Sequence, residues 1–330
     1  MECRKGCIIE KIIIIVIYNY CNMLPDNFRL GYACINMHLR EKGIFMSRTA
    51  RLATVKSHGI EYIKELGMKN AIDLLEILKW NKANDIYFFR ISSEFFPYAS
   101  HAEYGYSLDY VDNKLKEIGR YIKDNKMRIT MHPAQFNILS TSNANIVKNT
   151  FRDLNHHADI LNRMQLDDNS VMIIHGGGVY NDKKKALARL EKNILKLPIK
   201  TRNRLVLENC EMAYTVQDLL PICEKINMPL VIDFHHDALN PSELPVENYF
   251  DRVYKIWDAR KIKPKVHVSN SIPGTKPTDS ITIKRKHSDY IYYMHAALIS
   301  LRIPIDVMLE CKMKEKALLR YKKNKLTLST

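Results

Sequence analysis

The chain has 330 residues and a formal net charge of +15, from 51 lysines and arginines against 36 aspartates and glutamates. This length excludes a small disulfide-stapled domain and suits an α/β barrel, which needs roughly 250 residues. The basic excess favours a polyanionic partner, although usage rich in lysine, isoleucine and asparagine also follows from an A+T-rich genome. The seven cysteines include no Cys-x-x-Cys pair, so we expect reduced thiols in an intracellular protein.

The first residues differ from the rest of the chain. Residues 1–22 combine basic residues with an apolar run at 12–17, which is too short to span a bilayer because a span takes about 20 apolar residues. The run resembles the core of a signal peptide, but no small-residue cleavage site follows it. We predict that residues 1–22 are an extension outside the fold, that residues 23–330 form one domain, and that deleting the extension leaves activity intact.

Short runs rich in β-branched and aromatic residues recur along the remaining chain. We predict eight strands at residues 28–35, 85–92, 127–133, 171–177, 204–210, 229–234, 263–270 and 304–311. Amphipathic segments bearing lysine and glutamate lie between them, and those at 108–126 and 183–197 are typical of helices. The alternation predicts an α/β fold, a single closed (β/α)8 TIM barrel, followed by a basic, solvated helix or tail at 312–325.

Polar side chains close six consecutive predicted strands. At or near the C-terminal ends of the third to eighth strands stand His132, His175, Glu208, Asp233, His267 and Glu310. Those ends converge on one face of a barrel, where the active site lies. A lone histidine there is usually structural, but a ring of imidazoles and carboxylates would repel and lack solvation without cations between them. The pattern predicts a polynuclear metal site, and mixed nitrogen and oxygen ligands suit zinc or manganese.

Loops bring further histidines to the same face. His101 follows the second strand, His287 follows the seventh, and the adjacent pair His235 and His236 follows Asp233. If the pair continues an extended segment, its two rings point in opposite directions. We select His236 as the ring that faces the site.

Eight motifs, taken together, resemble one known family. They run from Arg29 to the segment around Asp289 and read RLGYACIN, FFRISSEFFPYASH, MHPAQF, IIHGGG, LVLEN, VIDFHHDALNP, KVHVSNS and KHSDYI. This combination is similar to the ultraviolet damage endonucleases of the UvdE type, a branch of the endonuclease IV-like and sugar-isomerase barrels. The resemblance covers nearly the whole chain beyond Met23, and Glu310 fits the last strand.

The resemblance implies a DNA repair endonuclease that nicks duplex DNA immediately 5′ of cyclobutane pyrimidine dimers and 6-4 photoproducts by metal-dependent phosphodiester hydrolysis. It implies two or three divalent cations, with Mn²⁺ expected and Zn²⁺ or Mg²⁺ as alternatives. The implied ligands are His132, His175, Glu208, Asp233, His236, His267, His287 and Glu310, with His101 as a less certain ninth. Glu208 would be the bridging carboxylate. Lys265 matches a family lysine that is carboxylated, and the alternative is an ordinary barrel lysine that pairs with a carboxylate.

The same resemblance implies DNA contacts for Tyr32 and Asn36, after the first strand, and for Gln135 and Phe136, after His132. The family uses a glutamine–aromatic pair to enter the duplex at the lesion, where poor stacking lowers the cost of extrusion. The alternative for Phe136 is plain packing under its loop. We expect a monomer that binds lesion-containing duplex DNA, has no membrane partner and stays inside the cell wherever the DNA is.

Two other activities on the same barrel are alternatives. An abasic-site endonuclease of the endonuclease IV type carries Asp-x-His where this chain has Arg285-Lys286-His287, and Arg285 cannot be a metal ligand. A metal-dependent sugar isomerase or epimerase is disfavoured by the charge of +15 and the histidine-rich rim. The HGGG motif at 175–178 lacks the Gly-x-Ser-x-Gly elbow that an esterase needs.

Overall fold

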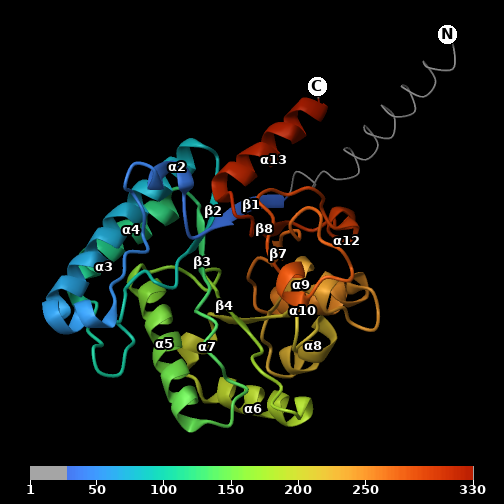
Figure 1. Ribbon diagram of the computed structural model, residues 1–330, viewed down its shortest axis with the longest axis horizontal. Helices are drawn as coiled ribbons and strands as arrows, with labels where there is room; N and C mark the ends of the chain where they lie inside the picture. The colour runs from blue at the N-terminus through green and yellow to red at the C-terminus, as the bar shows by residue number, and fades with distance from the viewer. Residues whose placement is uncertain (1–27, 330) are drawn as a thin grey trace.

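The computed structural model describes residues 28–329, and these form a closed barrel of eight parallel strands in chain order (Figure 1). The predicted (β/α)8 barrel is confirmed. The strands are β1 (Phe28–Ala33), β2 (Phe88–Ile91), β3 (Arg128–Met131), β4 (Met172–His175), β5 (Leu205–Glu208), β6 (Leu230–Asp233), β7 (Lys265–Val268) and β8 (Ile305–Leu309). Each lies within its predicted run. The predicted extension at residues 1–22 lies outside the described residues.

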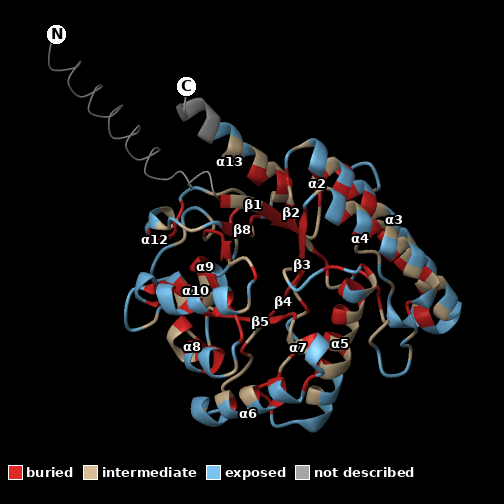
Figure 2. Ribbon diagram, turned by 180° about the vertical axis from the view of Figure 1, so that it is seen from behind, coloured by how far each residue is buried: buried red, intermediate tan, exposed pale blue. Residues whose placement is uncertain are grey.

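Helices surround the barrel, with their exposed faces outward and their buried faces toward the strands (Figure 2). They are α2 (Met37–Arg40), α3 (Leu52–Ala83), α4 (Asp112–Asp124), α5 (Ala144–Arg163), α6 (Lys183–Lys196), α7 (Ile199–Arg202), α8 (Val216–Lys225), α9 (Phe234–Leu239), α10 (Phe250–Ala259), α11 (Ile281–Lys284), α12 (Ala296–Ser300) and α13 (Lys314–Ser329), with 3-10 turns η1 (Asp109–Val111) and η2 (Val246–Tyr249). The helix predicted at 108–126 is therefore η1 followed by α4, and the one predicted at 183–197 is α6.

The inner face of α4 illustrates why these segments are helical. Leu115, Ile118 and Ile122 are buried at helical spacing, which puts one apolar stripe against the barrel. Gly119 lies on the same stripe, and a Cβ there would come within 1.8 Å of the Met164 carbonyl oxygen. The glycine lets α4 approach the end of α5 closely.

The C-terminal helix α13 is packed over its first turns, where a fully solvated segment was predicted. Leu318 and Glu315 are 0% exposed. The Glu315 carboxylate accepts hydrogen bonds from the backbone N–H groups of Met37 and His38 at 2.8 and 2.9 Å. A glutamate in a lysine-rich stretch gave no sign of this role, because its partners are backbone groups far away in the chain.

Four cysteines in the described part of the chain are free: Cys34, Cys210, Cys223 and Cys311. None of the helices within residues 28–329 combines the length and apolarity that crossing a membrane requires.

Candidate metal centre

Seven of the nine predicted ligands come together at the C-terminal mouth of the barrel. Their donor atoms fall into three overlapping groups, with the atoms of each group within 4.8 Å of one another. The groups are His132, His175 and Glu208; Glu208, Asp233 and His236; and Asp233, His267 and Glu310. Glu208 and Asp233 each belong to two groups, so these two carboxylates could bridge neighbouring cations.

Strand register explains part of this convergence. His175 pairs with Glu208 across β4 and β5, and Asp233 pairs with His267 across β6 and β7. Side chains at one level of adjacent parallel strands lie side by side, and here both pairs stand at strand ends. The last residues of β4, β5 and β6 and the last but one of β7 therefore supply four of the seven ligand residues.

Glu208 is the hub of the cluster and is 1% exposed. Its Oε2 lies 3.0 Å from His132 Nε2, and its Oε1 lies 2.8 Å from His267 Nδ1. Burial raises the pKa of this carboxyl, but the surrounding imidazoles, led by His267 and His175, outweigh it and hold the pKa well below the ordinary value. Glu208 is therefore a carboxylate at neutral pH.

Helix α9 corrects one step of the sequence reasoning. We predicted an extended segment through His235 and His236, but the chain turns into a helix at Phe234. Asp233 caps that helix, since its Oδ1 accepts from the N–H groups of His235 and His236 at 2.7 and 2.8 Å. His236 Nδ1 comes within 3.5 Å of Glu208 Oε1, while the ring of His235 lies 5.4 Å from that of His287. Helical turning rather than strand alternation separates the two rings.

The electrostatics of the cluster favour an added cation. Burial would lower the pKa of His236, but Asp233, Glu208 and Glu211 outweigh it and raise the pKa to about 9. Burial lowers the pKa of His132 to about 4, despite its contact with Glu208. His132 is therefore neutral, the form that binds metals, whereas His236 sits where the surrounding carboxylates stabilise positive charge.

Two buried side-chain atoms of the cluster have no hydrogen-bond partner within residues 28–329. They are Asp233 Oδ2 and His175 Nδ1, although buried polar groups in native proteins are nearly always bonded. Asp233 Oδ2 belongs to the cluster, and the imidazole nitrogens of His236 and His267 lie 3.7 and 3.9 Å from it, too far for hydrogen bonds. The donor set of imidazoles and carboxylates fits divalent transition metals, and the orphaned Asp233 oxygen fits a direct ligand.

Lys265 lies beneath the cluster and is 1% exposed. Its Nζ is 2.7 Å from His267 Nε2. Burial, Arg90 and Arg128 together hold the pKa of Lys265 well below its ordinary value. This lowering favours the neutral amine, and the close contact of the side chain is an imidazole where the alternative interpretation expected a carboxylate.

Two predicted ligands lie outside the three groups. His287 Nδ1 is 2.7 Å from Ser269 Oγ, and the imidazole is close enough to Glu310 to help lower the pKa of that carboxyl. His101 is exposed, and its Nδ1 accepts from the backbone N–H groups of Glu103 and Tyr104 at 3.1 and 3.2 Å. The role of each as a ligand stays a prediction.

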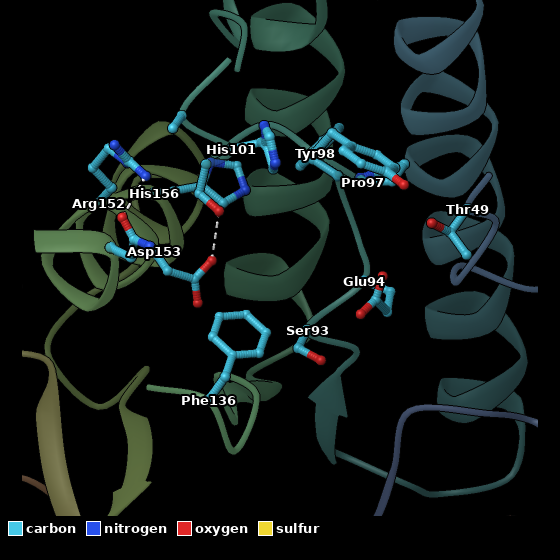
Figure 3. A pocket seen from close by; sticks show the side chains of 14 residues that line it. Thr49, Ser93, Glu94, Pro97, Tyr98, His101, Phe136, Arg152, Asp153 and His156 are labelled. Carbon is cyan, nitrogen blue, oxygen red and sulfur yellow. Dashed lines mark hydrogen bonds between the residues drawn. The ribbon is translucent and has the colours of Figure 1, made fainter. Parts of the chain in front are cut away.

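A pocket of about 360 Å³ lies between the loop after β2 and the start of α5. Figure 3 shows His101 at one end of it and the Phe136 ring at the other. Phe136 is 61% exposed, and Gln135 beside it is also exposed. Plain packing therefore does not account for Phe136, and both side chains are accessible to a ligand.

Tyr32 and Asn36 are not brought to the surface. They are 0% and 1% exposed. Tyr32 donates to Asn81 Oδ1 at 2.6 Å and accepts from Asn36 Nδ2 at 2.9 Å. Asn36 also caps α2 by accepting from the Leu39 N–H group. In this structure both side chains hold the loop after β1, and a DNA contact by either stays a prediction.

Sequence reasoning missed one residue of the centre. Arg90 points from β2 into the barrel and forms an ion pair with Glu310. Burial raises the pKa of Glu310, but Arg90, His267 and His287 together outweigh it and hold that pKa well below its ordinary value. An arginine inside the apolar run FFRI was a usable signal, because such a charge needs a buried partner.

Known proteins were compared with the chain. A family model described as UV-endonuclease UvdE matches residues 28–329. The UV-damage endonuclease of Schizosaccharomyces pombe is 38% identical over 306 residues, which cover 89% of this chain and 50% of that protein. The UV DNA damage endonuclease of Bacillus cereus is 34% identical over 259 residues, which cover 76% of this chain and 79% of that protein. The chain spans about half the length of its Schizosaccharomyces pombe and Neurospora crassa relatives.

Solved structures give the same answer for the fold. SacUVDE superimposes with a TM-score of 0.80 at 30% identity, over 92% of this chain and 99% of that chain. A D-psicose 3-epimerase from Clostridium cellulolyticum H10 reaches a TM-score of 0.50 at 15% identity, over 78% of this chain and 92% of that one. The second likeness is one of fold alone. The chain belongs to the UV-endonuclease UvdE family.

Proposed function

We propose that this protein is a metal-dependent endonuclease that nicks duplex DNA immediately 5′ of ultraviolet photoproducts. The observation that carries the proposal is the set of three overlapping ligand groups at the barrel mouth, in a chain of the UV-endonuclease family. The exposed Phe136 stands four residues beyond His132, which belongs to one of those groups. This arrangement supports phosphodiester chemistry next to a ring that can enter a distorted duplex.

Hydrolysis of a phosphodiester requires an activated water, neutralised phosphate oxygens and a stabilised leaving oxygen. Divalent cations held by the three groups would supply this chemistry, and Mn²⁺ is the metal we propose. The protein's own side chains fix the geometry of the ligand groups. Glu208 stays ionised, Glu208 and Asp233 are each shared between two groups, and Arg90 holds Glu310 in place from the barrel interior. His287 and His101 would complete the outer positions.

Lys265 is proposed to carry a carboxylated side-chain nitrogen. Only a neutral amine adds carbon dioxide, and burial together with Arg90 and Arg128 favours that neutral form. The product is an anion, which the same two guanidinium groups would stabilise. Incubation with ¹³C-bicarbonate should give one carbamate carbon signal in NMR spectra. If that signal persists in Lys265→Arg, the modified lysine is another one.

Gln135 and Phe136 are proposed to read the lesion. An aromatic ring that stacks on an unpaired base contributes about 1–3 kcal/mol. Photoproducts stack poorly, so opening the duplex at them costs less than at intact pairs. Lesion preference would follow from that difference, and Tyr32 and Asn36 would act by holding the loop after β1.

The proposal is tested by incubating ultraviolet-irradiated, abasic and untreated supercoiled plasmids with the protein in Mn²⁺ or in EDTA. We expect nicking of irradiated plasmid in Mn²⁺, little nicking of untreated plasmid, and none in EDTA. Mapping the nick should give a 3′-hydroxyl directly 5′ of the dimer. Preferential nicking of abasic plasmid would instead support the endonuclease IV-type activity, and nicking unaffected by EDTA would refute the metal-dependent mechanism.

A further inference from the structure

A second pocket opens at the opposite, N-terminal end of the barrel. It has a volume of about 500 Å³. Its lining includes five cationic side chains from the starts of β1, β3 and β7 and the end of α4: Arg29, Lys123, Lys126, Arg128 and Lys263. None of them belongs to the metal-ligand groups, so this pocket is separate from the proposed active site.

One buried carboxylate lies behind this lining. Asp306 is 0% exposed, and both of its oxygens are fully engaged. Arg29 donates to Oδ1 at 2.8 Å and to Oδ2 at 2.6 Å, Arg128 donates to Oδ2 at 2.8 Å, and Lys263 Nζ lies 2.7 Å from Oδ1. Three cations thus share one negative charge. The buried Nη2 of Arg128 finds no acceptor in the described part of the chain, so donors outnumber acceptors.

The remaining two cations have no countercharge of their own. Lys123 and Lys126 are exposed, and no ion pair or side-chain hydrogen bond joins either ammonium group to another residue within 28–329. Asp167 is the carboxylate in the lining. Its two oxygens accept from the N–H group and the side-chain amide of Asn169 at 3.0 and 3.2 Å. Five cations therefore face two carboxylates whose oxygens are already bonded.

We propose that this pocket is a binding site for a small phosphate-bearing anion. Unpaired ammonium groups over a low-dielectric wall concentrate positive potential, and phosphate oxygens are strong acceptors for lysine and arginine donors. The neutral donors Gln165, Asn169 and Ser170 complete the lining. A concave pocket favours a compact ligand over the extended backbone of a duplex. The proposal does not depend on the nuclease activity, since the two sites lie at opposite barrel ends.

The test is calorimetric titration of inorganic pyrophosphate into the full chain, with EDTA present so that no metal-bound phosphate contributes to the signal. We compare the parent with the Lys123→Gln/Lys126→Gln variant, in which both changes are on exposed side chains and spare the Asp306 network. The matched control is Lys184→Gln/Lys200→Gln, which removes the same charge from exposed positions elsewhere. We expect the pocket variant to bind pyrophosphate at least tenfold more weakly than the parent, and the control variant to bind it like the parent.

Three outcomes would overturn the proposal. They are no measurable binding to the parent, equal weakening in both variants, or no weakening in the pocket variant. Undamaged duplex DNA is titrated in parallel. The salt concentration is kept the same, because the affinity of a protein for phosphate groups depends on salt. If the pocket variant loses affinity for DNA but not for pyrophosphate, the pocket is part of a DNA track and the small-anion site is refuted. Nicking of irradiated plasmid should be the same in all three proteins, which separates this test from that of the nuclease.

Discussion

The two ends of the barrel use charge in opposite ways. At the N-terminal end, Asp306 is surrounded by three cations that occupy both of its oxygens. At the C-terminal end, Glu208, Asp233 and Glu310 gather with imidazoles, and Asp233 Oδ2 has no hydrogen-bond partner in residues 28–329. The chain's own cations occupy the carboxylate of the first network and leave an excess of positive charge, whereas in the second network a carboxylate oxygen is left without a hydrogen-bond donor among the described residues.

This difference predicts which property each end controls. Removing one member of a neutralised buried network leaves uncompensated charge and destabilises the fold. Replacing one carboxylate of the metal-ligand cluster by its amide removes a charged metal ligand, so we expect it to cost mainly function. Substitutions at the N-terminal end of the barrel should therefore change mainly its stability, and substitutions at the C-terminal end should change mainly its activity.

The largest effect is expected from Glu208→Gln. An amide cannot neutralise two cations, so incision of irradiated plasmid should fall by more than about a hundredfold, since losing even an outer partner of a metal ligand costs about 10–100-fold. The circular dichroism spectrum should stay that of the parent. Initial nicking rates in Mn²⁺ measure the effect.

Glu211→Gln is the matched control for that variant. Glu211 follows the same strand and lies 3.9 Å from His236 Nε2 but belongs to none of the three ligand groups. Its loss should lower the rate by about tenfold, the low end for an outer partner of a metal ligand, because 3.9 Å is too long for a hydrogen bond to His236. Equal losses in the two variants would mean that Glu208 has no special role in the cluster.

The opposite end is tested by Asp306→Asn. Its removal leaves three cations facing one another in and around a buried site, which should lower the free energy of unfolding by about 3–5 kcal/mol. At temperatures where the variant is folded, its nicking rate should match the parent. Asp258→Asn, an exposed acid on α10, should change stability by no more than about 0.5 kcal/mol. Urea unfolding measures the free energy of unfolding of both variants. An unchanged free energy of unfolding for Asp306→Asn would contradict the distinction between the two ends of the barrel.

Acid should weaken the same network. Burial would raise the pKa of Asp306, but Arg29, Arg128 and Lys263 outweigh it and lower the pKa from 3.8 to about 2. The ionised Asp306 carboxylate stabilises the folded state fully at pH values above its unfolded-state pKa. That stabilisation is lost as the pH falls from about 4 through about 2. The stability difference between parent and Asp306→Asn should therefore shrink by about 1 kcal/mol between pH 6 and pH 3. A difference that grows on acidification would contradict the assigned pairing.

The smallest effect is expected on the recognition of the lesion by Gln135 and Phe136. Gln135→Ala/Phe136→Ala should weaken binding to a dimer-containing duplex by about tenfold, because stacking on a base contributes about 1–3 kcal/mol. Affinity for the undamaged twin at the same salt concentration should change little, since phosphate contacts dominate it. Metal content should equal that of the parent. If the variant still discriminates as well as the parent, the lesion is read elsewhere.

The strands and the ligand cluster were predictable from sequence because both follow local patterns. Short apolar runs ended in His132, His175, Glu208, Asp233 and Glu310, and a closed barrel necessarily brings such ends to one face. Seven predicted ligands indeed meet there.

What escaped prediction depends on three-dimensional partners. The capping of α9 by Asp233, the contact of Arg90 with Glu310 and the burial of Glu315 against α2 all join groups whose meeting only the folded chain decides. Tyr32 and Asn36 looked like surface residues of a loop, yet Tyr32 lies in β1, both side chains are buried, and the Asn36 amide donates to the Tyr32 hydroxyl. A residue's position in a motif did not reveal which way its side chain points.

The measurement that tests this account most directly is calorimetric unfolding in Mn²⁺ and in EDTA, for the parent, Glu208→Gln and Asp306→Asn. A cation that binds only the folded state raises the unfolding temperature. We predict a rise of several degrees in the parent and an equal rise in Asp306→Asn, from a lower starting temperature. Glu208→Gln should show little or no rise. The account would be contradicted if Mn²⁺ left the parent unchanged, or if Glu208→Gln responded as strongly as the parent does.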